Sequence, residues 1–223
     1  FHENATLRIG GITFFLSLNL VFNYLFFSKN IFYLEYLSFS TLFFTLGLID
    51  DLKINLQPKF RLGLMIIFLI FLVIYNNFYI TKVGLDFLNH LLEIDIFALF
   101  FVCLCFLFII NGSNLIDGFN GLLGLHALII FLVLFFINLI NENNDLAYLL
   151  IFISLPTLIF LKFNFPKAQI FFGDSGAYLV GSLIAISVIK TSILNPEISP
   201  FFFCILLFYL FFEVFFRSEE RRV

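Results

Sequence analysis

Charged side chains are scarce in this sequence. Asp, Glu, Lys and Arg make up 12% of its 223 residues, about half of the fraction that a soluble domain carries. Hydrophobic residues make up 62%, and the mean hydropathy is +1.09. The net charge of -3 is too small to indicate a nucleic-acid partner. The scarcity of charge excludes an ordinary soluble fold and predicts an all-α, polytopic helix bundle in a membrane.

Cysteine is also rare, and tryptophan is absent. Cys103, Cys105 and Cys204 are an odd number without paired spacing, and each lies in an apolar run. They therefore predict neither a disulfide framework nor a metal site, and we expect them to fill space in the core. The first residues lack a basic start followed by a short apolar core, so no cleavable signal peptide is visible.

Apolar segments of membrane-spanning length recur along the whole chain, with no soluble domain between them. With about 20 residues for each span, the length of the chain allows about eight crossings. We therefore expect one integral-membrane domain over residues 1–223. The segments lie near residues 9–28, 31–49, 62–80, 96–111, 122–140, 146–163, 176–194 and 199–216.

The distribution of Lys and Arg predicts the orientation in the membrane. With a cytoplasmic start, nine basic residues lie inside and three lie outside. The inside set is Arg8, Lys53, Lys59, Arg61, Lys162, Lys167, Arg217, Arg221 and Arg222, and the outside set is Lys29, Lys82 and Lys190. The same map places Asp50, Asp51, Asp117 and Asp174 on the cytoplasmic side. Because acidic residues play no part in the count, their convergence on one face supports the orientation independently.

Each acidic motif has a plain alternative role. Asp174, just before an apolar helix, fits an N-cap, and Asp117, followed by a glycine, fits a turn. Asp50 and Asp51 are harder to explain in this way, because adjacent like charges repel and point about 100° apart in a helix. Such a pair indicates one carboxylate facing a cation and one facing a substrate, with separated pKa values.

Residues 111–121 interrupt the apolar sequence with amides, a carboxylate and glycines. Asn111, Asn114 and Asp117 recur every third residue and would lie along one face of a helical turn. Amides can hold a base or a sugar, and glycines let the backbone approach the ligand. Four carboxylates would repel a bare phosphate, whereas Mg²⁺ binds one or two carboxylates together with phosphate oxygens. The residues therefore predict a cytoplasmic-face site for a Mg-bound diphosphate and phosphoryl transfer.

The nearby basic residues have two interpretations. Lys53, Lys59 and Arg61 follow the Asp50-Asp51 pair and could bind a lipid or nucleotide phosphate. They could equally be ordinary positive-inside residues. The sequence favours neither interpretation.

Four motifs occur in order between the apolar segments: TLRIGG at 6–11, GLIDD at 47–51, NGSNLIDGFNGL at 111–122 and FGDSG at 172–176. This arrangement resembles the polyprenyl-phosphate N-acetylhexosamine-1-phosphate transferases, relatives of the phospho-MurNAc-pentapeptide translocase. The resemblance implies transfer of a sugar 1-phosphate from a UDP-N-acetylhexosamine to a polyprenyl phosphate such as undecaprenyl phosphate, with release of UMP. It places this step at the cytoplasmic face of the bacterial inner membrane, where it would initiate cell-surface polysaccharide synthesis.

The same resemblance implies roles for individual residues. An oxygen of the lipid phosphate attacks the β-phosphate of the UDP-sugar. Because a phosphate monoester is already largely ionised near pH 7, we favour positioning and metal electrostatics over general-base catalysis. The candidate catalytic residues are Asp50, Asp51 and Asp117; the candidate substrate ligands are Asn111, Asn114, Asn120, Lys53 and Arg61; and Asp174 is the candidate ligand of Mg²⁺, with Mn²⁺ as the alternative metal.

Three departures from the family pattern give rise to alternatives. Asn120 stands where many members carry a second Asp, which affects donor preference. A helix before the first motif and a His-rich loop after the last span are expected in the family and missing here, so a catalytically inactive fragment is one alternative. A cation-coupled transporter is another, but it predicts acidic residues near the middle of spans. A homodimer is left open.

Overall fold

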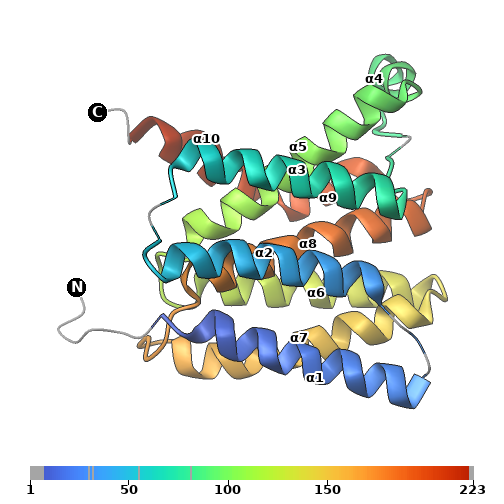
Figure 1. Cartoon of the computed structure of the whole chain (residues 1–223). Coiled ribbons are helices and arrows are strands. Elements are labelled where there is room, and N and C mark those ends of the chain that lie inside the picture. The colour runs from blue at the N-terminus through green and yellow to red at the C-terminus, as the bar shows by residue number, and fades with distance from the viewer. Residues whose placement is uncertain (1–7, 30, 32, 55, 81, 221–223) are drawn as a thin grey trace.

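The computed structural model describes residues 8–29, 31, 33–54, 56–80 and 82–220. Within these residues all regular structure is helical (Figure 1), which confirms the predicted all-α class. Thr6 and Leu7 of the first motif, and Arg221 and Arg222 among the basic residues predicted to lie on the inner side, are not among the described residues. The helices are α1 (Gly10–Lys29), α2 (Leu34–Asp51), α3 (Pro58–Asn76), α4 (Asp86–Leu92), α5 (Asp95–Ile116), α6 (Leu122–Ile140), α7 (Asn144–Asn164), α8 (Gly173–Leu194), α9 (Pro200–Leu206) and α10 (Phe208–Glu220).

Six helices in the described part of the chain are long and apolar enough to cross a membrane, namely α1, α3, α5, α6, α7 and α8. The helix α2 has 18 residues but carries Glu35, Asp50 and Asp51 near its ends. The last expected span, 199–216, is divided at Leu207 into α9 and α10. The polytopic bundle is therefore confirmed, with the number of crossings approximate. The short helix α4, between α3 and α5, was not expected from the sequence.

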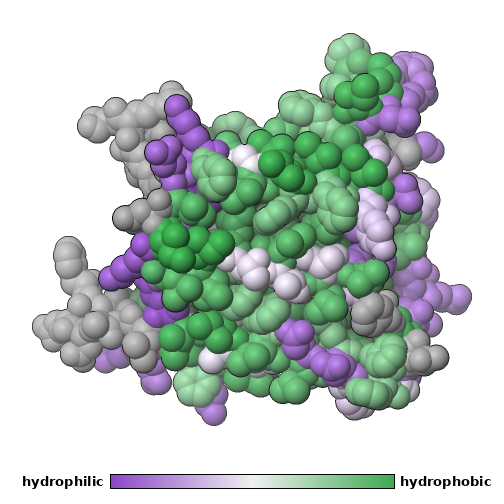
Figure 2. Space-filling model, in the orientation of Figure 1, coloured by the Kyte–Doolittle hydropathy of each residue, from purple (hydrophilic) through white to green (hydrophobic). Residues whose placement is uncertain are grey.

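Apolar side chains cover the lateral surface of the bundle. Figure 2 shows one face on which hydrophobic residues form a broad belt, while hydrophilic residues gather mainly at its two ends. Large side chains such as Leu20, Phe71 and Phe136 are exposed on this kind of surface. Exposed apolar surface of this extent suits contact with lipid rather than with water. The chain is therefore a multi-pass membrane protein.

The helix α8 is the central element of the bundle. It packs against α1, α2, α5 and α6, and every residue from Ser175 to Ile189 is buried. Much of this stretch consists of Gly, Ala and Ser, and small residues let neighbouring membrane helices approach closely. The most enclosed helix of the protein therefore carries Asp174 in its first turn.

Glycines in two of the sequence motifs permit this close packing around the start of α8. A Cβ atom added to Gly47 of α2 would lie 2.4 Å from the carbonyl oxygen of Asp174. A Cβ atom on Gly11 of α1 would lie 2.4 Å from the backbone nitrogen of Gly176. The N–H of Gly11 also donates to the carbonyl oxygen of Phe172 at 2.9 Å. The first turn of α8 is thus held between the backbones of α1 and α2.

At the opposite end of the bundle, separate polar contacts join α8 to its neighbours. The fully buried Asn138 of α6 donates through Nδ2 to Thr191 Oγ1 and to the carbonyl oxygen of Leu134, both at 2.8 Å. Lys190 of α8 forms an ion pair with Glu35 of α2. This end of the bundle is therefore fixed by contacts that do not involve the acidic motifs.

We expect Gly47→Ala to destabilise the protein by about 1–3 kcal/mol, because the added methyl meets backbone that cannot move aside. Gly63→Ala is the matched control, since a Cβ atom at Gly63 would meet nothing within 4 Å. Replacing a glycine inside an open helical surface should stabilise by up to about 1 kcal/mol. Thermal unfolding of the purified variants in detergent measures both changes. A Gly47→Ala protein as stable as the unmodified protein would show that α2 and α8 are not in backbone contact.

Candidate functional site

The helix ends that carry the four acidic residues identified from the sequence lie together at one end of the bundle, the left-hand end in Figure 1. Asp50 and Asp51 end α2, Asp117 follows the last residue of α5, and Asp174 lies in the first turn of α8. The prediction that these motifs share one face of the protein therefore agrees with the arrangement of the helices.

A pocket of about 280 Å³ lies between these elements, and we refer to it as the polar pocket. It brings together the carboxylates of Asp117 and Asp174, the amide of Asn114 and the guanidinium of Arg8. The positive guanidinium of Arg8 would attract a phosphate into the pocket, provided that a bound cation neutralises the two carboxylates, which would otherwise repel the phosphate. The full lining is Arg8, Asn114, Asp117, Gly118, Phe171, Gly173 and Asp174.

Asp51 does not line the polar pocket but contacts the helix end that forms part of it. Its Oδ1 accepts from the backbone N–H of Asp174 at 3.0 Å, and its Oδ2 accepts from the N–H of Ser175 at 2.9 Å. A carboxylate here satisfies unpaired N–H groups and complements the positive end of the helix dipole. Gly173 has φ of 71°, and a Cβ atom there would lie 2.8 Å from both Asp51 oxygens. The glycine therefore allows Asp51 to reach α8.

Asp50 points to a different partner. Its Oδ2 accepts from Arg61 Nη1 of α3 at 2.8 Å, and the Asp50 side chain is only 10% exposed. The Arg61 guanidinium also lies 5.7 Å from the ring centroid of Tyr178, and the Tyr178 hydroxyl accepts from Asn114 Nδ2 at 3.1 Å. A chain of polar contacts thus runs from α2 through α3 and α8 to Asn114 in the polar pocket. The two adjacent carboxylates diverge, and Asp50 faces a cation supplied by the protein. Where the sequence led us to expect a substrate beside the other carboxylate, the structure has the backbone N–H groups of α8 beside Asp51.

Asp117 is held in an environment that disfavours its charge. Burial raises the pKa of Asp117 well above its ordinary value. The negative charge of Asp174 raises this pKa further, and the positive charge of Arg8 opposes the rise. Two smaller effects oppose each other: the charge of Asp51 raises the pKa, and a hydrogen bond with the backbone of Gly173 lowers it. A cation bound beside Asp117 would favour its ionised form, because a nearby opposite charge lowers the pKa of a carboxyl group.

The chemistry of the pocket fits a hard divalent cation shared with a substrate. In the described residues no group of three or more His, Cys, Asp or Glu side chains is arranged to hold a metal ion by itself. Asp117 and Asp174 nevertheless line one cavity, and Mg²⁺ binds through one or two carboxylates completed by phosphate oxygens and water. The donor set therefore fits Mg²⁺ or Mn²⁺ when a phosphate ligand is present.

Three residues expected to bind substrate lie elsewhere. Asn111 donates through Nδ2 to the carbonyl oxygen of Leu107 within α5. Asn120 donates to the carbonyl oxygen of Pro166 at 3.2 Å, and Lys53 is exposed just beyond α2. Of the expected substrate ligands, Asn114 lines the polar pocket and Arg61 lies behind it, paired with Asp50.

Arg8 was not among the site residues expected from the sequence. It lines the polar pocket immediately before α1. In the sequence it appeared only as one of the basic residues on the predicted inner side and as part of the TLRIGG motif. That motif was the available signal, but the sequence alone does not show that its arginine and the carboxylates of two other motifs, Asp117 and Asp174, share one cavity.

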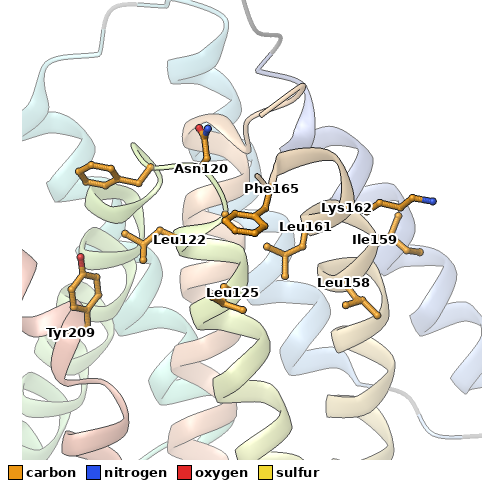
Figure 3. Close-up of a pocket in the computed structure, with 11 residues that line it drawn as sticks. Asn120, Leu122, Leu125, Leu158, Ile159, Leu161, Lys162, Phe165 and Tyr209 are labelled. Carbon is orange, nitrogen blue, oxygen red and sulfur yellow. The ribbon is translucent and has the colours of Figure 1, made fainter. Parts of the chain in front are cut away.

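Beside the polar pocket lies an apolar groove of about 870 Å³ (Figure 3). In Figure 3, Leu122, Leu125, Leu161 and Phe165 form its wall, while the Lys162 side chain extends away from it. The groove begins where the polar pocket ends along the chain, because Gly118 lines the pocket and the next residue lines the groove. Its full lining is Phe119, Asn120, Gly121, Leu122, Leu125, Leu158, Ile159, Leu161, Lys162, Phe165 and Tyr209.

Similarity to known proteins agrees with this arrangement. Residues 33–192 match the model of glycosyl transferase family 4. The chain is 32% identical to a phospho-N-acetylmuramoyl-pentapeptide-transferase of Dictyoglomus thermophilum and 30% identical to that of Dictyoglomus turgidum, covering 100% of this chain and 72% of each relative. A protein of the same name from Clostridium perfringens is 33% identical over 62% of this chain and 46% of its own length. The motifs, the helical bundle and these matches together show that the chain belongs to glycosyl transferase family 4, the family of polyprenyl-phosphate hexosamine-1-phosphate transferases.

Proposed function

We propose that this protein transfers a sugar 1-phosphate from a UDP-N-acetylhexosamine, or a related UDP-sugar, to a polyprenyl phosphate and releases UMP. The observation that supports this most strongly is the polar pocket, which holds Asp117, Asp174 and Arg8 in one cavity at the end of a membrane bundle. A water-soluble diphosphate and the headgroup of a lipid can meet at such a place. The acidic residues lie at helix ends rather than in the middle of spans, which disfavours the transporter alternative.

The proposed reaction is a displacement at phosphorus. An oxygen of the lipid phosphate forms a bond to the β-phosphorus of the UDP-sugar. The bond from that phosphorus to the bridging oxygen breaks, and the bridging oxygen leaves with UMP. Both nucleophile and leaving group are anionic, so positioning and charge stabilisation are the main contributions expected of the protein.

Residues of the polar pocket would make these contributions directly. Asp117 and Asp174 would hold Mg²⁺ or Mn²⁺, which when bound would neutralise charge on the diphosphate. Arg8 would contact a phosphate oxygen, because a guanidinium matches phosphate geometry. Asn114 would hydrogen-bond the nucleotide or the sugar through the part of its amide that Tyr178 leaves available.

Asp50 and Asp51 would act from behind the pocket. Asp51 would fix the first turn of α8 and hence Asp174, given its two hydrogen bonds to that turn. Asp50 would hold Arg61 beside Tyr178. These assignments give both residues a role in catalysis without direct contact with the transferred phosphate. Lys53 would contribute a more distant positive charge at the same membrane face.

The names of the relatives bear on the donor and on the product. They are phospho-N-acetylmuramoyl-pentapeptide-transferases, so a UDP-N-acetylmuramoyl-pentapeptide belongs in any donor panel. The lipid-linked product would start synthesis of a cell-surface polysaccharide at the cytoplasmic face of the bacterial inner membrane. The excess of basic residues at the end that carries the acidic motifs supports this orientation.

Release of UMP tests the reaction class. The purified protein is reconstituted into lipid membranes that contain polyprenyl phosphate. It is then incubated with each UDP-sugar of the donor panel in turn, with and without Mg²⁺. We expect UMP release that requires both the lipid and the metal. Release of no UMP with any donor, from protein shown to be folded, would contradict the proposal, whereas cation flux under the same conditions would favour a transporter.

We expect Asp174→Asn and Asp117→Asn each to lower the rate of UMP release by about 100-fold or more, because each removes a charge facing the reacting phosphates. Asp145→Asn is the matched control, since Asp145 is an exposed carboxylate in the first turn of α7, at the opposite end of the bundle. The measurement is the rate at saturating Mg²⁺. Near-normal rates in both pocket variants would remove the polar pocket from the mechanism.

Asp51→Asn should behave differently from Asp174→Asn, because an amide offers only one acceptor oxygen to the two N–H groups of α8 that Asp51 satisfies. We expect it to lower the free energy of unfolding by about 1–3 kcal/mol, the cost of leaving a buried donor unsatisfied, and to lower the rate as well. Asp174→Asn should lose rate while its thermal unfolding is little changed. If Asp51→Asn lost rate but kept the stability of the unmodified protein, Asp51 would act directly on the metal or the substrate.

A further inference from the structure

Two connecting segments form much of the wall of the polar pocket. The segment between α5 and α6 carries Asp117, and the segment between α7 and α8 leads to Asp174. The separation of these two carboxylates therefore depends on how the segments are held relative to one another. A metal ion that uses both carboxylates is sensitive to that separation, because Mg²⁺ demands a near-ideal octahedral arrangement of its ligands.

Asn164, the last residue of α7, joins the two segments directly. Its side chain is buried, with 3% of the residue exposed. Its Oδ1 accepts from the backbone N–H of Gly121 at 2.5 Å, and its Nδ2 donates to the carbonyl oxygen of Ile170 at 2.6 Å. One carboxamide thus satisfies a buried donor on one segment and an acceptor on the other. No apolar side chain of similar size could do so without leaving both groups unpaired.

Neighbouring contacts reinforce this connection. Gly121 has φ of 74°, and a Cβ atom there would lie 2.9 Å from the Phe165 ring. Asn120 donates to the carbonyl oxygen of Pro166 at 3.2 Å on the outer side of the same contact. The two segments are therefore joined by three side-chain hydrogen bonds. The bond from Gly121 to Asn164 is buried, the bond from Asn164 to Ile170 is partly buried, and the bond of Asn120 is exposed.

We propose that Asn164 is a positioning residue that sets the separation of Asp117 and Asp174 and thereby the affinity of the polar pocket for a divalent cation. It does not line the pocket and acts only through the two backbone segments. The inference rests on the proposed function, since it assumes that these two carboxylates share the metal. It also gives Asn120 a place in the site, as the outer member of the same connection rather than as a substrate ligand.

Mn²⁺ binding to the full chain tests this role separately from turnover. Free Mn²⁺ is measured by electron paramagnetic resonance during titration of the detergent-purified protein in the presence of UDP. We expect Asn164→Ala to weaken Mn²⁺ binding roughly 10- to 100-fold, the range found when groups that orient metal ligands are removed. Asn120→Ala, which loses only the exposed hydrogen bond, should weaken Mn²⁺ binding less. It provides the test of the connection if Asn164→Ala does not fold.

Asn138→Ala is the control for loss of a buried asparagine. Asn138 is also buried and makes three hydrogen bonds through its amide, with Leu134, Thr191 and Asn195, but at the opposite end of the bundle. It should lose thermal stability while keeping the Mn²⁺ affinity of the unmodified protein. Unchanged Mn²⁺ affinity in both Asn164→Ala and Asn120→Ala would overturn the positioning role. Failure of the unmodified protein itself to bind Mn²⁺ would instead contradict the metal-dependent function on which the inference rests.

Discussion

The first turn of α8 has no side-chain cap from its own segment, and two of its N–H groups donate to Asp51 at the end of α2. The two donors, Asp174 and Ser175, follow Asp51 in the sequence by 123 and 124 positions. The contact therefore joins two spans and at the same time fixes the position of Asp174. A backbone N–H group that is shielded from water is costly to leave unpaired, so the same hydrogen bonds that complete the fold also build the site.

Close backbone contact makes this arrangement possible. Gly47 lies against the carbonyl group of Asp174, and Gly11 lies against Gly176. Without these glycines α1 and α2 could not approach the start of α8, and Asp51 would not reach its N–H groups. The short motifs that contain the polar residues thus also contribute through glycine, because a position without a side chain lets the helices that carry these residues approach closely.

Much of this could be predicted from local sequence, and some of it could not. Hydropathy predicted α6 over 122–140 with the bounds that the structure has, because a span of apolar residues is a local property. The positive-inside pattern placed the acidic motifs at one end. The partner of Asp51, the place of Arg8 in the pocket and the role of Asn164 depend on contacts between distant segments, which no local pattern reveals. The break at Leu207 was also missed, since apolar residues continue on both sides.

The roles assigned to the carboxylates depend on which of them contact the metal when substrate is bound. Anomalous diffraction from Mn²⁺ in crystals of the protein with UDP measures this most directly. We expect an Mn²⁺ peak in contact with Asp117 and Asp174, with the Asp51 carboxylate still accepting from the N–H groups of Asp174 and Ser175. A peak in contact with Asp51, with the start of α8 released from that carboxylate, would contradict the roles proposed for these residues.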